Sequence, residues 1–200
     1  MKEIILKKGK LSNSDFKEIV SLLQKDKVLV LPTDTIYGLS AKADSLKARN
    51  KILRIKERVD KPFILLTADV EMISKYSSLN NKQREYLENK FSKNKRPTTY
   101  ILNLKKNNSL SFLSKDGTIA WRLPKRPFLI KIIKELNKPL ISTSLNISGR
   151  EAINDLNRIK NNYFKQENPH LIVNEGICKN TKASKIVDLR DMNNILIIRK

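Results

Sequence analysis

An unbroken apolar run, Val28-Leu29-Val30-Leu31, constrains the fold of this chain more than any other feature. Such a run is typical of a β-strand covered on both faces, because a half-exposed strand would alternate apolar and polar residues. Pro32 lacks a backbone donor, so we expect the strand to stop or leave the sheet there. Polar residues follow at once: Thr33, Asp34, Thr35 and Tyr37. A polar cluster at the end of a buried strand is where open α/β sheets usually bind small ligands.

The same polar residues allow a second interpretation. Thr33, Asp34 and Thr35 can form a capped turn whose side chains satisfy their own backbone. Gly38 would then permit a turn conformation that other residues resist. These residues alone leave both interpretations open.

Strand-like and helix-like segments alternate along the chain. We expect strands at residues 3–7, 28–31, 62–67, 98–104, 118–123, 139–143, 171–173, 185–189 and 195–199. We expect helices from Ser12 or Ser14 to before Asp26, from a cap at Asp44 to Lys56 with Leu46 on its buried stripe, and over 69–76, 80–91, 127–136 and 152–163. This order predicts an α/β fold, a single domain over residues 1–200 around one twisted sheet. The run of strands near the C-terminus favours a mixed sheet.

The scarcity of cysteine and histidine argues against several classes of functional site. Cys178 and His170 are the only cysteine and histidine, which argues against a disulfide framework, a histidine-based triad and a metal site. No apolar run approaches the ~20 residues that a membrane span needs. The N-terminus is too short and too interrupted by charge for a secretory signal. We therefore expect a cytoplasmic protein with no membrane partner.

The net charge is strongly positive, because 41 Lys and Arg face 20 Asp and Glu, which leaves +21. A basic domain attracts polyanions, and nucleic acid is the usual partner. The basic residues are scattered, however, and a chain rich in both Lys and Asn also arises from nucleotide bias. Charge alone leaves direct nucleic-acid binding open.

Four polar clusters follow apolar segments. They are Thr33 to Tyr37; Lys56-Glu57-Arg58 with Lys61; Thr118 and Arg122, which share one face of a strand; and Ser142, Thr143, Ser144, Asn146 and Ser148 with Gly149. These clusters are rich in cations and hydrogen-bond donors and poor in carboxylates, which suits phosphate or carboxylate substrates. Arg58 and Arg122 can bind such groups in a bidentate manner, whereas Lys56 acts as a point charge. Each cluster taken singly also fits ordinary helix-end and turn chemistry.

Six segments in this order resemble the threonylcarbamoyl-AMP synthase family, also called YrdC-like. They are P-T-D-T-I-Y-G-L (32–39), K-E-R (56–58), I-A-W-R-L-P (119–124), S-T-S-L-N-I-S-G (142–149), A-S-K-I-V-D (183–188) and I-I-R (197–199). The resemblance implies a twisted mixed β-sheet flanked by helices, with a basic concave cavity. It also implies the short form, without the extra C-terminal domain.

The activity that this resemblance implies is synthesis of threonylcarbamoyl-AMP and pyrophosphate from L-threonine, bicarbonate and ATP, for the threonylcarbamoyladenosine modification of tRNA. The implied catalytic residues are Lys56 and Arg58. Those implied on the threonine side are Thr35, Arg122, Ser144 and Ser184, and those on the nucleotide side are Arg58, Lys61, Thr118, Asn146 and Arg199. The cofactor would be Mg²⁺ with ATP, for which Asp34 is the one candidate protein ligand. Implied partners are downstream threonylcarbamoyl transferase proteins, with tRNA contact as a possibility.

Several positions depart from the family pattern, and three of them bear on the candidate site. Lys61 stands where an asparagine is common, Leu66 where many members have a histidine that faces threonine, and Leu145 where alanine is usual. We expect Leu145 to fill space behind Ser144 and Asn146. These departures leave room for two alternatives: an RNA-binding YrdC-like module without synthase activity, and an adenylating enzyme that uses a different acid.

Overall fold

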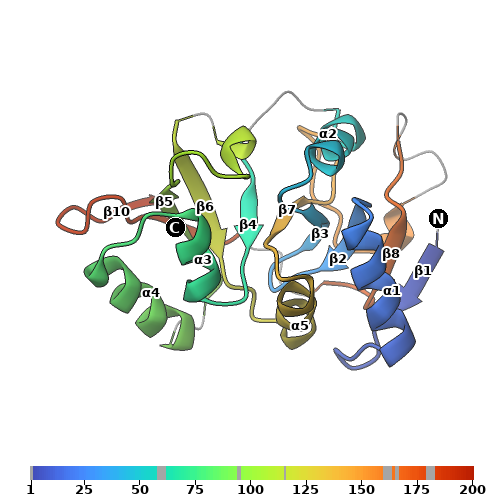
Figure 1. Ribbon diagram of the computed structural model, residues 1–200. Coiled ribbons are helices and arrows are strands. Elements are labelled where there is room, and N and C mark those ends of the chain that lie inside the picture. The colour runs from blue at the N-terminus through green and yellow to red at the C-terminus, as the bar shows by residue number, and fades with distance from the viewer. Residues whose placement is uncertain are drawn as a thin grey trace.

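The computed structural model describes residues 2–57, 62–93, 96–114, 116–159, 164, 167–178 and 183–200. Within these residues, ten strands form one sheet in the order β1-β8-β2-β3-β7-β4-β6-β5-β9-β10. Four neighbouring pairs are parallel (β1 with β8, β8 with β2, β4 with β6, β5 with β9), and the other five are antiparallel. The predicted α/β fold with a mixed sheet is therefore confirmed (Figure 1).

The strands agree with most of the predicted ranges. Their bounds are β1 Lys2–Ile5, β2 Leu29–Pro32, β3 Tyr37–Lys42, β4 Ile64–Leu66, β5 Thr98–Asn103, β6 Thr118–Arg122, β7 Leu140–Ser144, β8 Leu171–Asn174, β9 Lys185–Asp188 and β10 Leu196–Arg199. Nine of the ten sit within a residue or two of a predicted strand, because each carries the β-branched and apolar residues that fit a pleated, buried surface.

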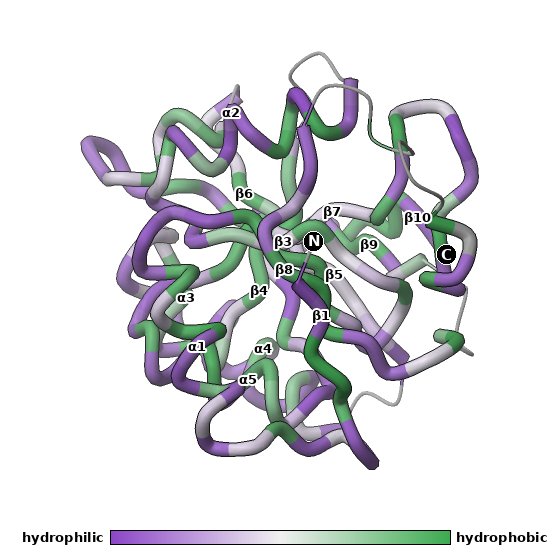
Figure 2. Tube along the Cα trace, turned by 90° about the vertical axis from the view of Figure 1, so that its right-hand side faces the viewer, coloured by the Kyte–Doolittle hydropathy of each residue, from purple (hydrophilic) through white to green (hydrophobic). Residues whose placement is uncertain are grey.

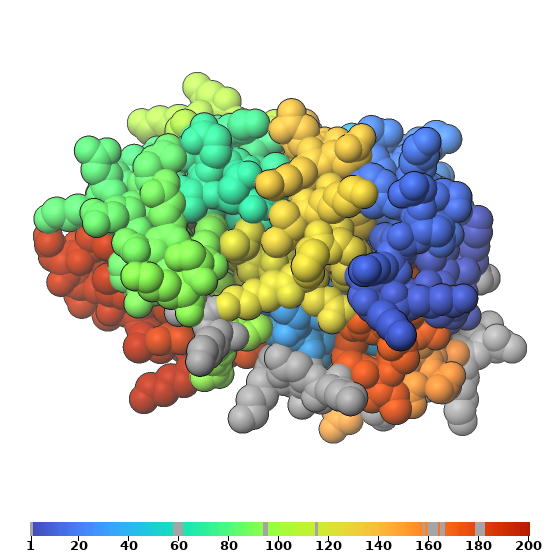
Figure 3. Space-filling view, turned by 90° about the horizontal axis from the view of Figure 1, so that it is seen from below, coloured from blue at the N-terminus to red at the C-terminus, as the bar shows by residue number. Residues whose placement is uncertain are grey.

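Five α-helices accompany the sheet in the described part of the chain: α1 Asn13–Gln24, α2 Leu46–Ile55, α3 Val70–Tyr76, α4 Asn81–Lys93 and α5 Pro127–Leu136. Ser12 caps α1 by accepting a hydrogen bond from the Asp15 backbone, and Pro127 occupies the first turn of α5, both as predicted. In Figure 1, α1, α5, α3 and α4 line the lower side of the sheet and α2 lies near the top. Figure 3 shows α5 in the middle of the lower face, between α1 and the α3–α4 pair.

A strand that the sequence did not predict, β3, lies at the centre of the sheet. It forms a hairpin with β2, in which Pro32 pairs with Tyr37, and its other edge pairs with β7. The predicted end of the 28–31 strand at Pro32 is confirmed, but the turn predicted at Gly38 is wrong, because Gly38 lies inside β3 opposite Ser144. Glycine and serine are poor strand formers, so β3 forms because both neighbours bury it, not because of its own propensity.

Helix α2 begins one residue later than predicted. Its N-cap is Ser45, whose side chain accepts a hydrogen bond from the Ala48 backbone, so the assignment of the cap to Asp44 is wrong. Asp44 instead forms an ion pair with Lys138, at 2.9 Å. Leu46, predicted on the buried stripe, is 52% exposed, whereas Ile52 is fully buried. The first residue of α2 therefore faces solvent.

The helix predicted over 152–163 does not form in its described part. Residues 152–159 contain a single 3-10 turn, η2 (Leu156–Arg158), and residues 160–163 lie outside the described residues. The backbone N–H of Ile153 donates instead to the carbonyl of Leu145, which ties this segment to the loop after β7. That tertiary bond overrides the local helical pattern.

The hydrophobic core fills both sides of the sheet. Trp121, Tyr37 and Tyr100 are its largest fully buried side chains. Figure 2 shows the apolar segments gathered on the central strands and the hydrophilic ones in the outer loops and helices. None of the helices formed by the described residues has the length and apolar character needed to span a membrane.

Two substitutions in α2 test which face of this helix packs on the sheet. Ile52→Ala should lower the free energy of unfolding by about 2–5 kcal/mol, because it leaves a cavity in the core, whereas Leu46→Ala should change it by less than about 0.5 kcal/mol. Chemical denaturation followed by circular dichroism measures both. A cost for Leu46→Ala similar to that of Ile52→Ala would contradict the observed orientation of α2.

Candidate functional site

The turn between β2 and β3 is held by threonine hydroxyls. The Thr33 hydroxyl donates to the carbonyl of Ile36 at 2.7 Å and accepts from the backbone N–H of Thr35 at 3.1 Å. The two threonine hydroxyls also lie 2.9 Å apart. The capped-turn interpretation is thus correct for Thr33, whereas the hydroxyl of Thr35 also faces an arginine.

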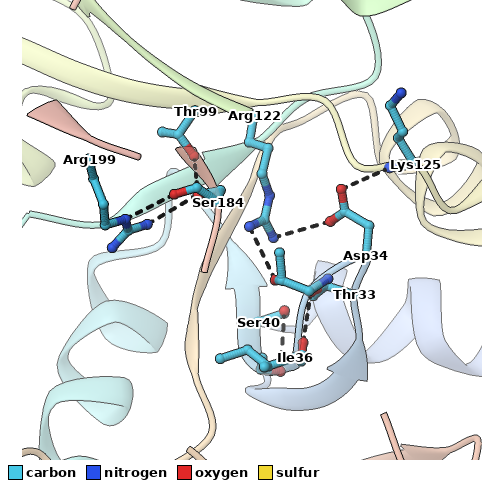
Figure 4. Close-up of polar contacts among 11 residues, drawn as sticks. Thr33, Asp34, Ile36, Ser40, Thr99, Arg122, Lys125, Ser184 and Arg199 are labelled. Atoms are coloured by element: carbon cyan, nitrogen blue, oxygen red, sulfur yellow. Dashed lines mark hydrogen bonds and ion pairs between the residues drawn. The ribbon is translucent and has the colours of Figure 1, made fainter. Parts of the chain in front are cut away.

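That arginine is Arg122, which comes from the end of β6 and is 5% exposed. Its Nη1 donates to Thr35 Oγ1 at 3.3 Å, and its Nη2 lies 3.5 Å from Asp34 Oδ1 (Figure 4). Burial lowers the pKa of the guanidinium from its usual value, and the charge of Asp34 opposes that shift. The Nε–H of Arg122 is buried and has no acceptor among the described residues, which leaves one donor for a ligand.

The loop after β7 is held by Lys56, the residue that follows α2. Lys56 is 2% exposed, and its Nζ donates to the carbonyl oxygens of Ser144 and Asn146 at 2.7 and 3.0 Å and to Asn146 Oδ1 at 2.8 Å. The backbone of Lys56 accepts from the N–H of Ser148 at 2.8 Å. Both its side chain and its backbone therefore fix this loop.

A third group joins β5, β9 and β10 at the other side of the site. The Ser184 hydroxyl lies 2.8 Å from that of Thr99. Arg199 donates from Nε to the Ser184 carbonyl at 2.9 Å and from Nη2 to its hydroxyl at 3.3 Å (Figure 4). These bonds turn the Arg199 guanidinium from the exposed strand β10 toward Ser184.

Gly38 allows β3 and β7 to approach closely at the floor of the site. A Cβ atom at this position would lie 2.8 Å from Ser142 Oγ and 3.4 Å from Thr33 Cγ2. Real Cβ contacts are not that short, so close approach, and not a turn, explains the glycine. The absent side chain leaves the space above it open.

These groups surround one cavity of about 450 Å³. Six predicted site residues line it: Thr35, Arg122, Ser144, Asn146, Ser184 and Arg199. Of the other predictions, Lys56 and Thr118 are not among the lining residues; Thr118 starts β6 and donates to Asp116 Oδ1 at 2.7 Å. Arg58 and Lys61 lie outside the described residues. The structure thus gathers all four predicted threonine-side residues at one site, with two of the five predicted nucleotide-side residues, Asn146 and Arg199.

The cavity also contains residues that the sequence did not indicate, above all Arg150. Phe63, Ile64 and Ala152 are further wall residues of this kind. Arg150 follows Gly149, which has a φ of 84° and reverses the loop. The position of Arg150 directly after a serine–glycine turn could have indicated a ligand-binding residue from the sequence. The apolar wall residues carry no such signal, because tertiary packing alone brings them to the cavity.

Two departures from the family pattern lie in the core. Leu145 is fully buried behind Ser144 and Asn146, which confirms its predicted space-filling place. Leu66 is also fully buried, pairs with Arg122 across β4 and β6, and is not among the lining residues. A leucine is compatible with position 66 because the side chain there packs within the hydrophobic core.

A smaller polar hollow of about 330 Å³ shares Thr33 and Thr35 with the main cavity. It is lined by Arg126, which is ion-paired with Glu175, and by the buried Cys178. Burial, with the nearby Glu175 carboxylate, raises the pKa of the Cys178 thiol to about 12. Within the described ranges no group of three or more acidic, histidine or cysteine side chains could hold a metal ion.

Comparisons with known proteins agree on one family. A model of the Sua5/YciO/YrdC family, described as telomere recombination, matches residues 21–200. A Methanocaldococcus jannaschii protein named "Putative threonylcarbamoyl-AMP synthase" is 33% identical over 206 residues, which cover 100% of this chain and 94% of the relative. The threonylcarbamoyl-AMP synthase of Serratia proteamaculans is 28% identical over 156 residues, which cover 76% of this chain and 81% of that protein.

A solved structure has the same fold. The crystal structure of P. abyssi Sua5 complexed with L-threonine matches with a TM-score of 0.83 at 23% identity. The match covers 100% of this chain and 57% of that longer one. At this level of identity the likeness establishes the fold.

The close approach at Gly38 predicts a coupled pair of substitutions. Gly38→Ala should lower the free energy of unfolding by about 1–3 kcal/mol, because the new methyl group meets Ser142 Oγ. In a Ser142→Ala background, which removes that oxygen, the cost of Gly38→Ala should shrink. Chemical denaturation of the wild type, the two single variants and the double variant gives a double-mutant cycle. Strictly additive changes in the free energy of unfolding would show that the Ser142 hydroxyl is not the obstacle.

Cys178 should be unreactive in the folded protein. With a pKa of about 12, only about one thiol in ten thousand is ionised at pH 8, and the side chain is 5% exposed. A disulfide reagent such as DTNB should modify the native protein far more slowly than the protein in denaturant. Equal rates under the two conditions would contradict the buried placement of this thiol.

Proposed function

We propose, because this chain belongs to the Sua5/YciO/YrdC family, that it makes threonylcarbamoyl-AMP and pyrophosphate from L-threonine, bicarbonate and ATP. The name shared by the two curated relatives supports this activity. The observation that carries it is a single cavity that gathers arginines and hydroxyls from distant segments, with a buried donor of Arg122 still free. The reaction class is nucleotidyl transfer.

Arg122 is the proposed ligand of the threonine carboxylate. Its guanidinium is oriented by Asp34 and Thr35, and its Nε–H needs an acceptor. A carboxylate satisfies such a donor with a charge-assisted bond, which is about twice as strong as a neutral one. Thr35, Ser144 and Ser184 supply hydroxyls on the same side, as the resemblance implies.

The nucleotide occupies the remaining part of the cavity in this proposal. Asn146 and Arg199 line it, and Arg58, Lys61 and Thr118 stay assigned to it by resemblance alone. Arg58 is the proposed catalytic residue. Because Lys56 binds loop oxygens instead of lining the cavity, we assign it a positioning role.

The proposed chemistry needs little from protein acids or bases. L-Threonine and bicarbonate condense to threonine carbamate with loss of water. An oxygen of the carbamate group then attacks the α-phosphorus of ATP, the bond from that phosphorus to the oxygen bridging to the β-phosphorus breaks, and pyrophosphate leaves with the electron pair. Such a transfer depends on holding the reactants in line and neutralising charge. Among the described residues that line the cavity, none is a histidine, aspartate or glutamate, which fits this requirement.

The contacts of Asp34 bear on how Mg²⁺ would be bound. Asp34, the candidate magnesium ligand, already faces Arg122 and accepts from the Lys125 backbone at 3.3 Å. The described residues therefore do not form a magnesium site of their own. We propose that Mg²⁺ enters with ATP and is bound by its phosphates and water.

The remaining partners are proposed on the same basis. A product as labile as threonylcarbamoyl-AMP requires transferase proteins that move its threonylcarbamoyl group to tRNA, and the +21 charge is compatible with direct tRNA contact. We propose the cytoplasm as the compartment. An RNA-binding module without synthase activity is the competing function, favoured only by the charge.

Pyrophosphate release from the purified protein tests the proposal. We expect release from ATP and Mg²⁺ to require both L-threonine and bicarbonate. Release without bicarbonate would indicate a different adenylating reaction. RNA binding with a steep salt dependence, without any pyrophosphate, would indicate the RNA-binding module.

Arg122→Lys tests the threonine side. The variant keeps the charge but loses the fork geometry, so kcat/KM for L-threonine should fall by about 10- to 100-fold while KM for ATP changes little. Arg84→Ala, on the surface between α3 and α4, is the matched control and should behave as the wild type. An equal loss for ATP and threonine would contradict the assignment.

A further inference from the structure

We propose that Arg150 binds the β- and γ-phosphates of ATP, the part that leaves as pyrophosphate. This inference rests on the proposed function and adds a substrate-binding residue that neither the motifs nor the comparisons assign. It also assigns Asn146 a role in positioning Arg150.

The first observation is that Arg150 is the unpaired cation of the described cavity wall. The other two lining cations are committed: Arg122 faces Asp34 and Thr35, and Arg199 donates to Ser184. The guanidinium of Arg150 has no acceptor among the described residues, although its backbone is fixed. An unpaired guanidinium that lines a cavity can bind a phosphate in a bidentate manner without first breaking a protein contact.

The second observation is the way the loop holds Arg150. Asn146 Nδ2 donates to the Arg150 carbonyl at 2.6 Å, and the Arg150 N–H donates to the carbonyl of Ile147 at 3.1 Å. Gly149 supplies the left-handed backbone that reverses the chain between them. These two hydrogen bonds close a short loop over residues 146–150 and hold the backbone from which the Arg150 side chain extends.

The third observation is that both polar atoms of the Asn146 side chain already make hydrogen bonds within the protein. Its Oδ1 accepts from Lys56 Nζ at 2.8 Å and from the Ser144 hydroxyl at 2.6 Å, and its Nδ2 is used on Arg150. The ammonium of Lys56 likewise donates to three loop oxygens. Asn146 therefore keeps only the second N–H of its Nδ2, whereas the whole guanidinium of Arg150 has no acceptor among the described residues.

Exposure indicates which part of the nucleotide Arg150 meets. Arg150 is exposed, whereas Arg122, Asn146 and Ser184 are all buried. The triphosphate tail carries most of the negative charge of ATP and must leave toward solvent as pyrophosphate. A cation at the exposed rim fits that tail, and the buried groups fit the parts that stay.

Binding of inorganic pyrophosphate, ATP and AMP, measured by isothermal titration calorimetry, tests the assignment. Arg150→Ala should weaken pyrophosphate and ATP by about 10- to 100-fold, because it removes a charge-assisted bidentate contact. Affinity for AMP and L-threonine should not change. Arg150→Lys should lie in between, because a point charge replaces the fork. Arg84→Ala removes the same side chain outside the cavity and should bind all four ligands normally.

Asn146→Ala, combined with Arg150→Ala, tests the positioning role by a measurement that a general loss of stability would not change. If Asn146 acts through Arg150, the effects of the two substitutions on pyrophosphate affinity should be much less than additive in the double variant. Additive effects would assign Asn146 its own ligand contact and overturn its positioning role. Denaturation confirms that each variant is folded before it is titrated.

The outcomes separate this inference from the proposed function. Normal pyrophosphate affinity in Arg150→Ala, or an equal loss for AMP, would overturn the assignment of Arg150 even if the wild type is an active synthase. A wild type that binds pyrophosphate through Arg150 but releases none from ATP with threonine and bicarbonate would overturn the synthase and leave an anion-binding Arg150 in place.

Discussion

The ammonium group of Lys56 is the contact on which the site depends. A buried cation is costly unless each of its donors finds an acceptor, and an ammonium has three donors. The loop after β7 supplies these acceptors from residues 88 and 90 positions further along the chain. The end of α2 and the end of β7 are therefore fixed relative to each other, and everything that the loop presents to the cavity inherits that position.

The opposite wall is built on the same principle with a different cation. Arg122 is buried beside Asp34, and a charge pair in that environment is stable only with well-placed partners. Two of its donor groups face Asp34 and Thr35, while its Nε–H is left over. In each wall, protein oxygen atoms hold one buried cation in place, and particular hydrogen-bond donors stay available for ligands. This division explains why a cavity so rich in cations can keep a defined shape.

Much of this arrangement could be predicted from the sequence, for local reasons. Periodicity and caps located α1 and α5, and apolar runs located most strands, because those signals act within one segment. Strand β3 was missed because Gly38 and Ser40 are strand residues only between two buried neighbours. The motifs predicted which residues converge, but not that Lys56 holds a loop while Arg150 lines the cavity. That distinction depends on hydrogen bonds between segments, which spacing does not encode.

The placement of titratable groups shows what kind of catalysis this fold can perform. His170, the only imidazole, donates its backbone N–H to Val28 and is not among the lining residues, and the lining side chains of the described wall include no carboxylate. A site of this kind has no proton to exchange near neutral pH, so its contribution must come from fixed charges and donors. Those charges act most strongly where water is excluded, as at the buried Arg122. A reaction between two anions needs such a site, because bringing the reactants together is itself the electrostatic obstacle.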